Sequence, residues 1–346
     1  MLQDTVSRFA ADRCDLASRP THVIPSTGRD AANWQFLADL GLLALPFDES
    51  FGGMGGQAGD LIVVMEAIGR SLIPEPYLAE IILGGLALAR AGGDAAQIGA
   101  VVAGTRHVAF AWAEHASRQH WDRPATKVAG DRLSGAKTFV LAGDDVDAYI
   151  VVARESADSL GLYQVDAAAR GVRRRDYRLI DGSTAQEIEF RDVAATRLAG
   201  GDMLATLFDD ARLAASAEML GIMEMLFAVT LDYLRTREQF GVPIGSFQAI
   251  QHRMADLYAR LQQSRSLLYR AIAVDPGERA AAVAATSAYV GSAAIDLAEQ
   301  CVQYHGGMGV SEETIVGHGL CRIMLLGNLF GSPSDELARY AALSAG

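Results

Sequence analysis

The sequence has no uncharged apolar segment of the length that a bilayer requires. Its longest uncharged run, Ala280 to Ile295, is rich in alanine and falls short of the ~20 residues of a transmembrane helix. The amino terminus, MLQDTVSRFAADRCD, carries charges throughout and lacks the basic and then apolar plan of a signal peptide. We therefore expect no membrane-spanning segment and no membrane partner.

Cysteine is scarce, and the histidines do not form a metal motif. The three cysteines, Cys14, Cys301 and Cys321, make no CxxC pair, which favours a reducing, cytoplasmic location. The sequence has neither an HxH nor an HExxH arrangement, so it predicts no metal site. The seven histidines are His22, His107, His115, His120, His252, His305 and His318.

Positive charge is in deficit as well. The chain has 30 Lys and Arg against 42 Asp and Glu, a formal net charge of −12, which disfavours a nucleic-acid partner. Its 346 residues are 50% hydrophobic, which is ample for a buried core in two or three subdomains. The composition indicates a soluble globular protein.

Three regions of different texture follow one another along the chain. Residues 1–104 alternate helical stretches with glycine-rich loops, and residues 105–200 contain short β-type runs between turns. Residues 201–346 carry apolar side chains at spacings of three and four, as in Leu213, Ala217 and Leu220. We predict an α+β fold with an N-terminal helical domain, a middle antiparallel β domain and a C-terminal helical bundle.

Three consecutive basic residues, Arg173 to Arg175, predict a solvated turn, although a contact to phosphates stays open.

The stretch REQFGVPIGSFQAIQ, residues 237–251, interrupts two of the predicted bundle helices. The loop can direct Arg237, Phe240 and Gln248 at one ligand. A guanidinium fork suits phosphate, a phenyl ring offers a flat apolar face, and an amide both donates and accepts hydrogen bonds. The set is typical of a nucleotide-tail site. The alternative is a plain helix-hairpin turn in which Arg237 pairs with Glu238 or Asp232.

Two C-terminal stretches, REQFGVPIGSFQAIQHRMADLYARL and QYHGGMGVSEETIVGHGLCRIM, resemble the acyl-CoA dehydrogenase family. The resemblance includes the Arg-x-x-Phe-Gly and Gln-x-x-Gly-Gly loops and the helix–β–helix order of the whole chain. It implies that the middle domain is a β-barrel or sandwich, that the bundle has four helices, and that FAD is the cofactor. It also implies that the FAD tail, bound mainly to a neighbouring subunit, is held by Arg237, Phe240, Gln248, Gln303, Gly306, Gly307 and Ser332.

The family reaction requires a carboxylate base that removes the α-proton of an acyl-CoA thioester. Most members place a Glu before a Gly near the C-terminus, and Phe330 stands there in LFGSPSDEL. Another branch places its Glu at the start of a bundle helix, where this chain has Ala211. Asp210 and Glu218 are weak substitutes, because the first is expected at a helix N-terminus and the second in a solvated or interhelical position. Asp335 and Glu336 fit the first turn of the last helix.

The region expected to hold the flavin ring also departs from the family. In WAEHASRQHWD, Ala113 and His115 replace the usual Thr and Pro, and the glycines are missing. The strand that customarily reads Trp-Ile-Thr is Phe139 to Leu141 here, so a hydroxyl is lost. The tail loops are therefore kept while the base and the ring site are not.

This asymmetry favours a chain that completes the site of another chain. The resemblance is to the shorter, Glu-lacking subunit of bacterial heteromeric dehydrogenases of the steroid side-chain type, which are two-plus-two tetramers. It implies an acyl-CoA substrate, a homologous partner subunit and an electron-acceptor flavoprotein. Three alternatives stay open: a homo-oligomer with a displaced base, a non-catalytic scaffold, and a flavin-dependent oxidase or monooxygenase of the same fold.

Overall fold

The chain forms two compact units in a computed structural model that describes residues 2–14, 28–117 and 120–345. Of the described residues, 2–14, 58–73 and 212–345 form the helical unit, and 28–57, 74–117 and 120–211 form the sheet unit. One helix, α6 (Leu204–Thr236), passes from the sheet unit into the helical unit. The sheet unit contains residues on both sides of the expected domain boundaries at residues 104 and 200. The three-domain division therefore stays a prediction.

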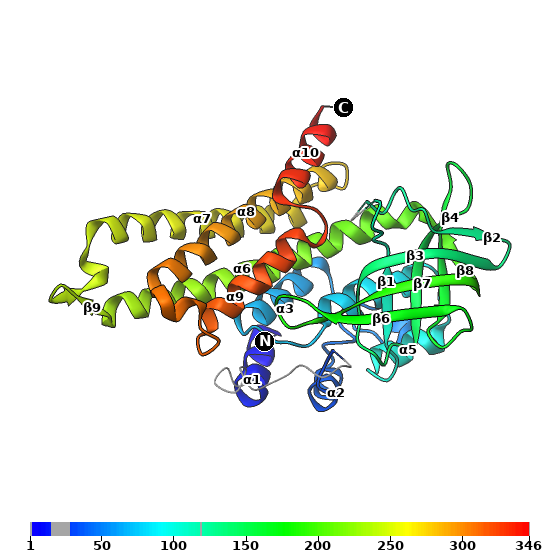
Figure 1. Cartoon of the computed structure of the whole chain (residues 1–346), viewed down its shortest axis with the longest axis horizontal. Coiled ribbons are helices and arrows are strands. Elements are labelled where there is room, and N and C mark those ends of the chain that lie inside the picture. The colour runs from blue at the N-terminus through cyan, green and yellow to red at the C-terminus, as the bar shows by residue number, and fades with distance from the viewer. Residues whose placement is uncertain (1, 15–27, 118–119, 346) are drawn as a thin grey trace. The chain divides into compact units, whose positions relative to one another are not determined.

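An eight-stranded sheet is the centre of the sheet unit (Figure 1). The strands pair in the order β6-β7-β3-β2-β4-β5-β8, and β1 pairs with β4. Apolar side chains of β3, β4 and β7 meet in one core cluster that includes Leu133, Tyr149 and Phe190. The strands are β1 (Val108–Ala111), β2 (Lys127–Ala129), β3 (Arg132–Leu141), β4 (Ala148–Arg154), β5 (Leu160–Asp166), β6 (Val172–Arg178), β7 (Thr184–Ala194) and β8 (Thr196–Gly200).

Two strand pairings correct the expectation of an antiparallel domain. β1 runs parallel to β4, with Val108 opposite Ala148, and β2 meets β4 in parallel at Lys127 and Arg154. β4 is buried from Ala148 to Ala153, as is typical of a strand with neighbours on both sides and apolar residues on both faces. Among the described strands the order ends at β6 and β8, so the sheet is open.

The predicted turn at Arg173 to Arg175 is wrong, because these residues lie on the edge strand β6. Arg175 pairs with Glu187 of β7 at 2.7 Å, and Arg174 lies 4.0 Å from Asp176. Exposed charges on an edge strand oppose sheet-to-sheet association. The unit's helices are α2 (Ala31–Asp39), η2 (Glu49–Phe51), the π-helix η3 (Leu78–Gly85), α4 (Leu86–Arg90), α5 (Ala95–Val102) and η4 (Gly201–Met203).

The helical unit is built around α6, α7, α8 and α9. The predicted spacing of apolar residues holds, because Leu213, Ala217 and Leu220 are all buried on α6. The expectation that Asp335 and Glu336 begin the last helix is confirmed. The helices are α1 (Leu2–Arg13), α3 (Ala58–Arg70), α7 (Gln248–Ala273), α8 (Arg279–His305), α9 (Ile315–Leu329) and α10 (Pro333–Ser344), with short turns η5 (Ile244–Ser246) and η6 (Gly306–Val310) and strands β9 (Glu238–Gln239) and β10 (Val242–Pro243).

Three helical segments reach the length and apolar composition of a membrane span: Gly201–Thr236, Arg279–Val310 and Ile315–Ser344. In the first, 78% of the apolar window is buried inside the protein. Burial within the protein gives this window an apolar environment without lipid. The absence of a membrane-spanning segment stays a prediction.

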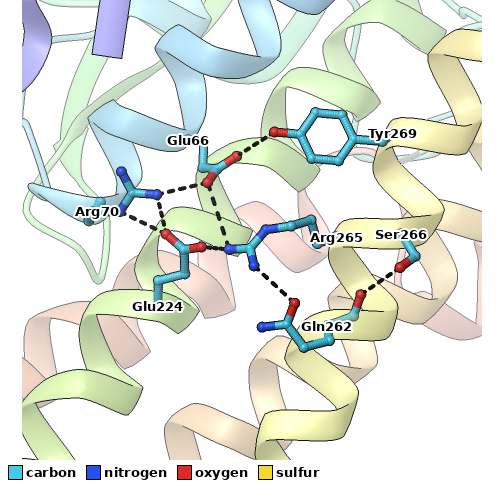
Figure 2. Close-up of polar contacts among 7 residues, drawn as sticks. All are labelled: Glu66, Arg70, Glu224, Gln262, Arg265, Ser266 and Tyr269. Atoms are coloured by element: carbon cyan, nitrogen blue, oxygen red, sulfur yellow. Dashed lines mark hydrogen bonds and ion pairs between the residues drawn. The ribbon is translucent and has the colours of Figure 1, made fainter. Parts of the chain in front are cut away.

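A network of charged side chains joins α3, α6 and α7 in the helical unit (Figure 2). The Glu224 carboxylate of α6 pairs with Arg70 of α3 and with Arg265 of α7. Glu66 accepts from Arg70 at 2.8 Å and lies 3.5 Å from the Tyr269 hydroxyl. Two carboxylates and two guanidiniums balance one another, so the three helices are joined without a surplus charge.

We expect Glu224→Gln to lower the free energy of unfolding by about 1–3 kcal/mol, because both guanidiniums lose a charged acceptor. The measurement is urea unfolding followed by circular dichroism. Glu299→Gln is the matched control, since Glu299 is exposed on α8 of the same unit. Equal midpoints for the two variants would show that the network contributes nothing to stability.

Candidate functional site

A hairpin made of β9 and β10 connects α6 to α7 (Figure 1). It carries Arg237 and Phe240, which were expected to hold a nucleotide tail. The structure replaces the expected loop with a tight two-stranded hairpin, in which Gln239 pairs with Val242. Its turn residues Phe240 and Gly241 have φ values of 56° and 80°, the signs that a type I′ turn requires. Asn-Gly is the usual choice there, whereas a bulky residue at positive φ is strained, and such strain is frequent at functional sites.

The strained turn places an aromatic ring in solvent. Phe240 is 92% exposed and contacts the Phe247 ring edge-on, with centroids 6.2 Å apart. Next to it, the main chain of Arg237 accepts a hydrogen bond from the Ile244 amide at 2.9 Å, which closes the hairpin. The Arg237 side chain is exposed and has no ion pair within the described residues. Its predicted alternative partners, Glu238 and Asp232, are therefore not engaged.

A glycine turn at the end of α8 provides the second half of the predicted tail site. Gly306 has φ 60° and ψ −137°, a conformation that favours glycine, and both Gly306 and Gly307 are exposed. A Cβ at either position would meet nothing within 4 Å, so the main chain stays accessible to a ligand from outside. Gln303 is exposed one turn earlier, and Gln248 is the first residue of α7.

The donors on these two loops fit the tail of FAD. An exposed guanidinium, two amide side chains and an accessible glycine main chain are the groups that bind a pyrophosphate and a ribose. A mostly apolar pocket of about 290 Å³ lies behind the hairpin, where α6, β10 and α7 meet. It is lined by Leu231, Leu234, Arg235, Pro243, Gly245, Ile250, Gln251 and Met254.

Ser332, the remaining predicted tail residue, lies on another part of the helical unit. It is the N-cap of α10, where its hydroxyl accepts from the Asp335 amide at 3.2 Å and donates to the Asp335 carboxylate at 2.7 Å. This capping box stabilises the start of α10. The role of Ser332 in cofactor binding stays a prediction.

The two positions where the family carries its base are filled by buried apolar side chains. Phe330 is buried, and the Arg212 guanidinium lies over its ring at 5.9 Å. Arg212 also donates to Glu336 at 2.7 Å. The cavity beside Phe330 measures about 20 Å³, enough for about one water. Ala211 is buried as well.

The two substitute carboxylates are held in ion pairs. Asp210 was expected at a helix N-terminus, and this is wrong: α6 begins at Leu204, and Asp210 pairs with Arg90 at 2.5 Å. The interhelical position of Glu218 is confirmed, since its Oε1 accepts from Arg322 of α9 at 2.6 Å. The other oxygen of Glu218 is buried and has no hydrogen-bond partner among the described residues.

The sheet unit contains a buried ion pair that the sequence reasoning missed. Lys137, one of two lysines in the chain, is fully buried and donates to the Glu114 carboxylate at 2.7 Å and to the Trp112 carbonyl at 3.1 Å. Glu114 also accepts from the amides of Ala125 and Thr126 at 2.6 and 3.0 Å. Burial lowers the pKa of Lys137 to about 8, although Glu114 opposes the change. The pair therefore fixes the chain that leaves β1 against β3.

The structure describes most of the region that was expected to hold the flavin ring. Ala113 is buried, whereas His115 is exposed and lies 3.5 Å from Glu187. Phe139 has a φ of 55° at a register shift between Lys137 and Val140. Phe139 to Leu141 carry no hydroxyl, and residues 118–119 of the quoted loop lie outside the described part of the chain. The loss of the flavin-ring site stays a prediction.

Within the described residues, no group of three or more His, Cys, Asp or Glu side chains could hold a metal ion. His22 of the sequence survey lies outside that part of the chain. The predicted absence of a metal stays a prediction.

Comparison with known proteins identifies the family. Residues 1–98 match the acyl-CoA dehydrogenase N-terminal domain and residues 199–333 match the acyl-CoA dehydrogenase C-terminal domain. Acyl-CoA dehydrogenase FadE27 of Mycobacterium tuberculosis is 31% identical over 82% of this chain and 80% of that protein. Acyl-CoA dehydrogenase IpdE2 of Mycolicibacterium smegmatis is 29% identical over 99% and 97%, respectively.

A solved structure agrees with this result. The ChsE4–ChsE5 complex from Mycobacterium tuberculosis contains a chain 28% identical to this one, with a TM-score of 0.87 over 99% of this chain and 96% of that chain. The chain thus belongs to the acyl-CoA dehydrogenase family, whose members are FAD-dependent oxidoreductases. The expected α+β fold class is confirmed, with a sheet that is open rather than a closed barrel.

Proposed function

We propose that this chain is the base-lacking subunit of a hetero-oligomeric acyl-CoA dehydrogenase. In this assembly, a homologous partner subunit carries the catalytic Glu and holds the flavin ring. The present chain contributes Arg237, Phe240, Gln303 and the Gly306–Gly307 turn to the tail of the FAD bound there. The observation that carries the proposal is the contrast between an exposed, unpaired tail site and two base positions filled by Phe330 and Ala211.

In this proposal, the residues of this chain bind the FAD tail and take no part in proton transfer. The Arg237 fork would bind pyrophosphate oxygens, the exposed main chain at Gly306 and Gly307 allows close approach, and the amides of Gln248 and Gln303 suit the ribose and phosphate edges. When bound, FAD supplies the acceptor for the hydride that leaves the β-carbon of the acyl-CoA. The α-proton has to be taken by a carboxylate on the partner subunit.

The homomeric alternative would need Asp210 or Glu218 as a displaced base. Asp210 pairs with Arg90 and Glu218 pairs with Arg322, so both carboxylates already have a structural role. The unpartnered oxygen of Glu218 is the single observation that favours this alternative. A scaffold that binds no flavin is opposed by the strained Phe240 turn, because unselected strain costs stability.

A solved structure supports a proposal about the class of substrate. It is described as the Tcur3481–Tcur3483 steroid ACAD, and it is 28% identical to this chain, with a TM-score of 0.91 over 99% of this chain and 96% of that chain. A bulky, steroid-type acyl-CoA is therefore the proposed substrate class, and a two-plus-two tetramer is the proposed assembly. A cytoplasmic location and an electron-acceptor flavoprotein complete the proposal.

The test is Arg237→Ala in the assembly purified after co-expression with a Glu-bearing homologue. Loss of the charge-assisted contact should weaken FAD binding by about 1.5–3 kcal/mol, which is about 10–150-fold in the dissociation constant. FAD titration of the stripped assembly gives that constant. Arg270→Ala is the control, because Arg270 is exposed near the far end of α7. An unchanged constant for Arg237→Ala would refute the assignment of the tail site.

A further inference from the structure

An aromatic stack joins the helices that carry the two halves of the tail site. The Tyr233 ring on α6 and the His305 ring on α8 have centroids 4.3 Å apart and planes inclined by 22°. Tyr233 is four residues before Arg237, and His305 directly precedes the Gly306–Gly307 turn. His305 is buried and Tyr233 is half-buried, so the stack lies beneath the exposed site.

The His305 ring is fixed by a hydrogen bond to its own helix. Its Nδ1 lies 2.9 Å from the Cys301 carbonyl oxygen one turn earlier. Because a carbonyl oxygen only accepts, Nδ1 must carry the proton, which sets the tautomer and the plane of the ring. The last residue of α8 therefore presents a flat face of defined orientation to Tyr233.

Tyr233 is connected to the hairpin through its main chain. Its carbonyl oxygen accepts a hydrogen bond from the Arg237 amide at 2.8 Å, the last turn of α6. Each loop also has a local side-chain hydrogen bond: the Gln251 side chain donates to the Gly245 carbonyl at 3.0 Å, and the Thr314 hydroxyl donates to the Met308 carbonyl at 2.8 Å. Among the ring contacts of the described residues, the stack is the one that joins these two chain ends.

We propose that Tyr233 and His305 are positioning residues that set the separation of Arg237 from the Gly306–Gly307 turn. The inference rests on the proposed function, since it assigns these loops to one FAD tail. Neither ring is assigned a contact with the ligand. The stack acts by holding a guanidinium and a glycine main chain at the spacing that a pyrophosphate bridges, and misplacement by about 1 Å is enough to weaken such a site strongly.

The experiment compares FAD dissociation constants of the co-purified, stripped assembly. Tyr233→Phe keeps the stack and should bind FAD within about twofold of the unmodified protein. Tyr233→Met and His305→Leu remove the stacked face and should each raise the constant about tenfold. His305→Phe keeps a ring of similar size without the hydrogen bond to Cys301, and an intermediate value is expected. A raised FAD dissociation constant together with an unchanged unfolding midpoint is the readout that general loss of packing would not produce.

Tyr258→Leu is the matched control, since Tyr258 forms a ring pair elsewhere on α7 of this helical unit, with Phe227 at 5.7 Å. The unfolding midpoint of each variant distinguishes loss of the fold from misplacement of the tail-site residues. If His305→Leu does not fold, the FAD dissociation constant of His305→Phe is compared instead. If Tyr233→Met and His305→Leu bind FAD normally while Arg237→Ala does not, the positioning role is refuted and the tail site stands. If Arg237→Ala also binds normally, the proposed function itself fails.

Discussion

Purified on its own, this chain is expected to catalyse acyl-CoA-dependent reduction of a dye at least about 100-fold more slowly than a Glu-bearing family member. The side chains of Phe330 and Ala211 cannot accept a proton, and both are buried. Loss of a general base removes about 10²–10⁴-fold in rate, which is about 3–5 kcal/mol of barrier. Activity should appear when a Glu-bearing homologue is co-expressed.

Three further measurements define the outcome. Replacing the partner's Glu with Gln should abolish the activity of the mixed assembly, because the proposal assigns the removal of the α-proton to that Glu alone. Asp210→Asn in this chain should leave the rate within about threefold, since Asp210 serves an ion pair with Arg90. Robust turnover by the lone chain that disappears in Asp210→Asn or Glu218→Gln would instead establish a homomeric enzyme with a displaced base.

The sequence was most informative where a repeating pattern reports on burial. Apolar residues three and four apart predicted the helices of the bundle, and Leu213, Ala217 and Leu220 do share the buried side of α6. The short β-type runs of residues 105–200 predicted strands, and β7 has Ile188 and Phe190 buried. Periodicity works in these cases because helix and strand geometry place alternate side chains on fixed faces.

Features that depend on contacts between distant segments were not predictable in the same way. The parallel pairing of β1 with β4 joins residues about 40 positions apart, and nothing local distinguishes it from an antiparallel pairing. Asp210 was misplaced because helix starts are the least certain boundaries, and α6 begins six residues earlier at Leu204. The buried pair of Lys137 and Glu114 joins two charges that each look solvated in the sequence.

The candidate site shows the same difference between features with a local sequence pattern and features that depend on tertiary contacts. Arg237, Phe240 and Gln248 could be proposed because glycines and a basic residue in a helix break carry a local signal. Gln303, Gly306 and Gly307 were proposed from the resemblance to the acyl-CoA dehydrogenase family. The type I′ turn at Phe240 and the stack of Tyr233 on His305 could not be proposed, since the first breaks the usual residue preference and the second is a tertiary contact. Both lie at the tail site, where departures from local rules are expected.

Gly221→Ala is expected to destabilise the helical unit by about 3 kcal/mol or more, the largest stability effect we predict. A Cβ on Gly221 of α6 would lie 1.9 Å from the Glu66 carbonyl oxygen and 2.6 Å from the Arg70 amide of α3. The contact is reciprocal, because a Cβ on Gly69 of α3 would lie 1.9 Å from the Glu218 carbonyl oxygen. Main-chain atoms cannot rotate away, so the two helices would have to separate.

The intrinsic effect of this substitution has the opposite sign, which makes the test sharp. Alanine in a helix interior is favoured over glycine by about 0.5–1 kcal/mol. Gly327→Ala on α9 is the matched control, since the nearest atom to its Cβ would be Ile295 Cδ1 at an ordinary 3.6 Å, and we expect it to be neutral or mildly stabilising. Urea unfolding followed by circular dichroism measures both. Equal midpoints for Gly221→Ala and Gly327→Ala would show that α3 and α6 do not cross at this distance, and the Glu66, Arg70 and Glu224 network at that crossing would then have to be reassigned.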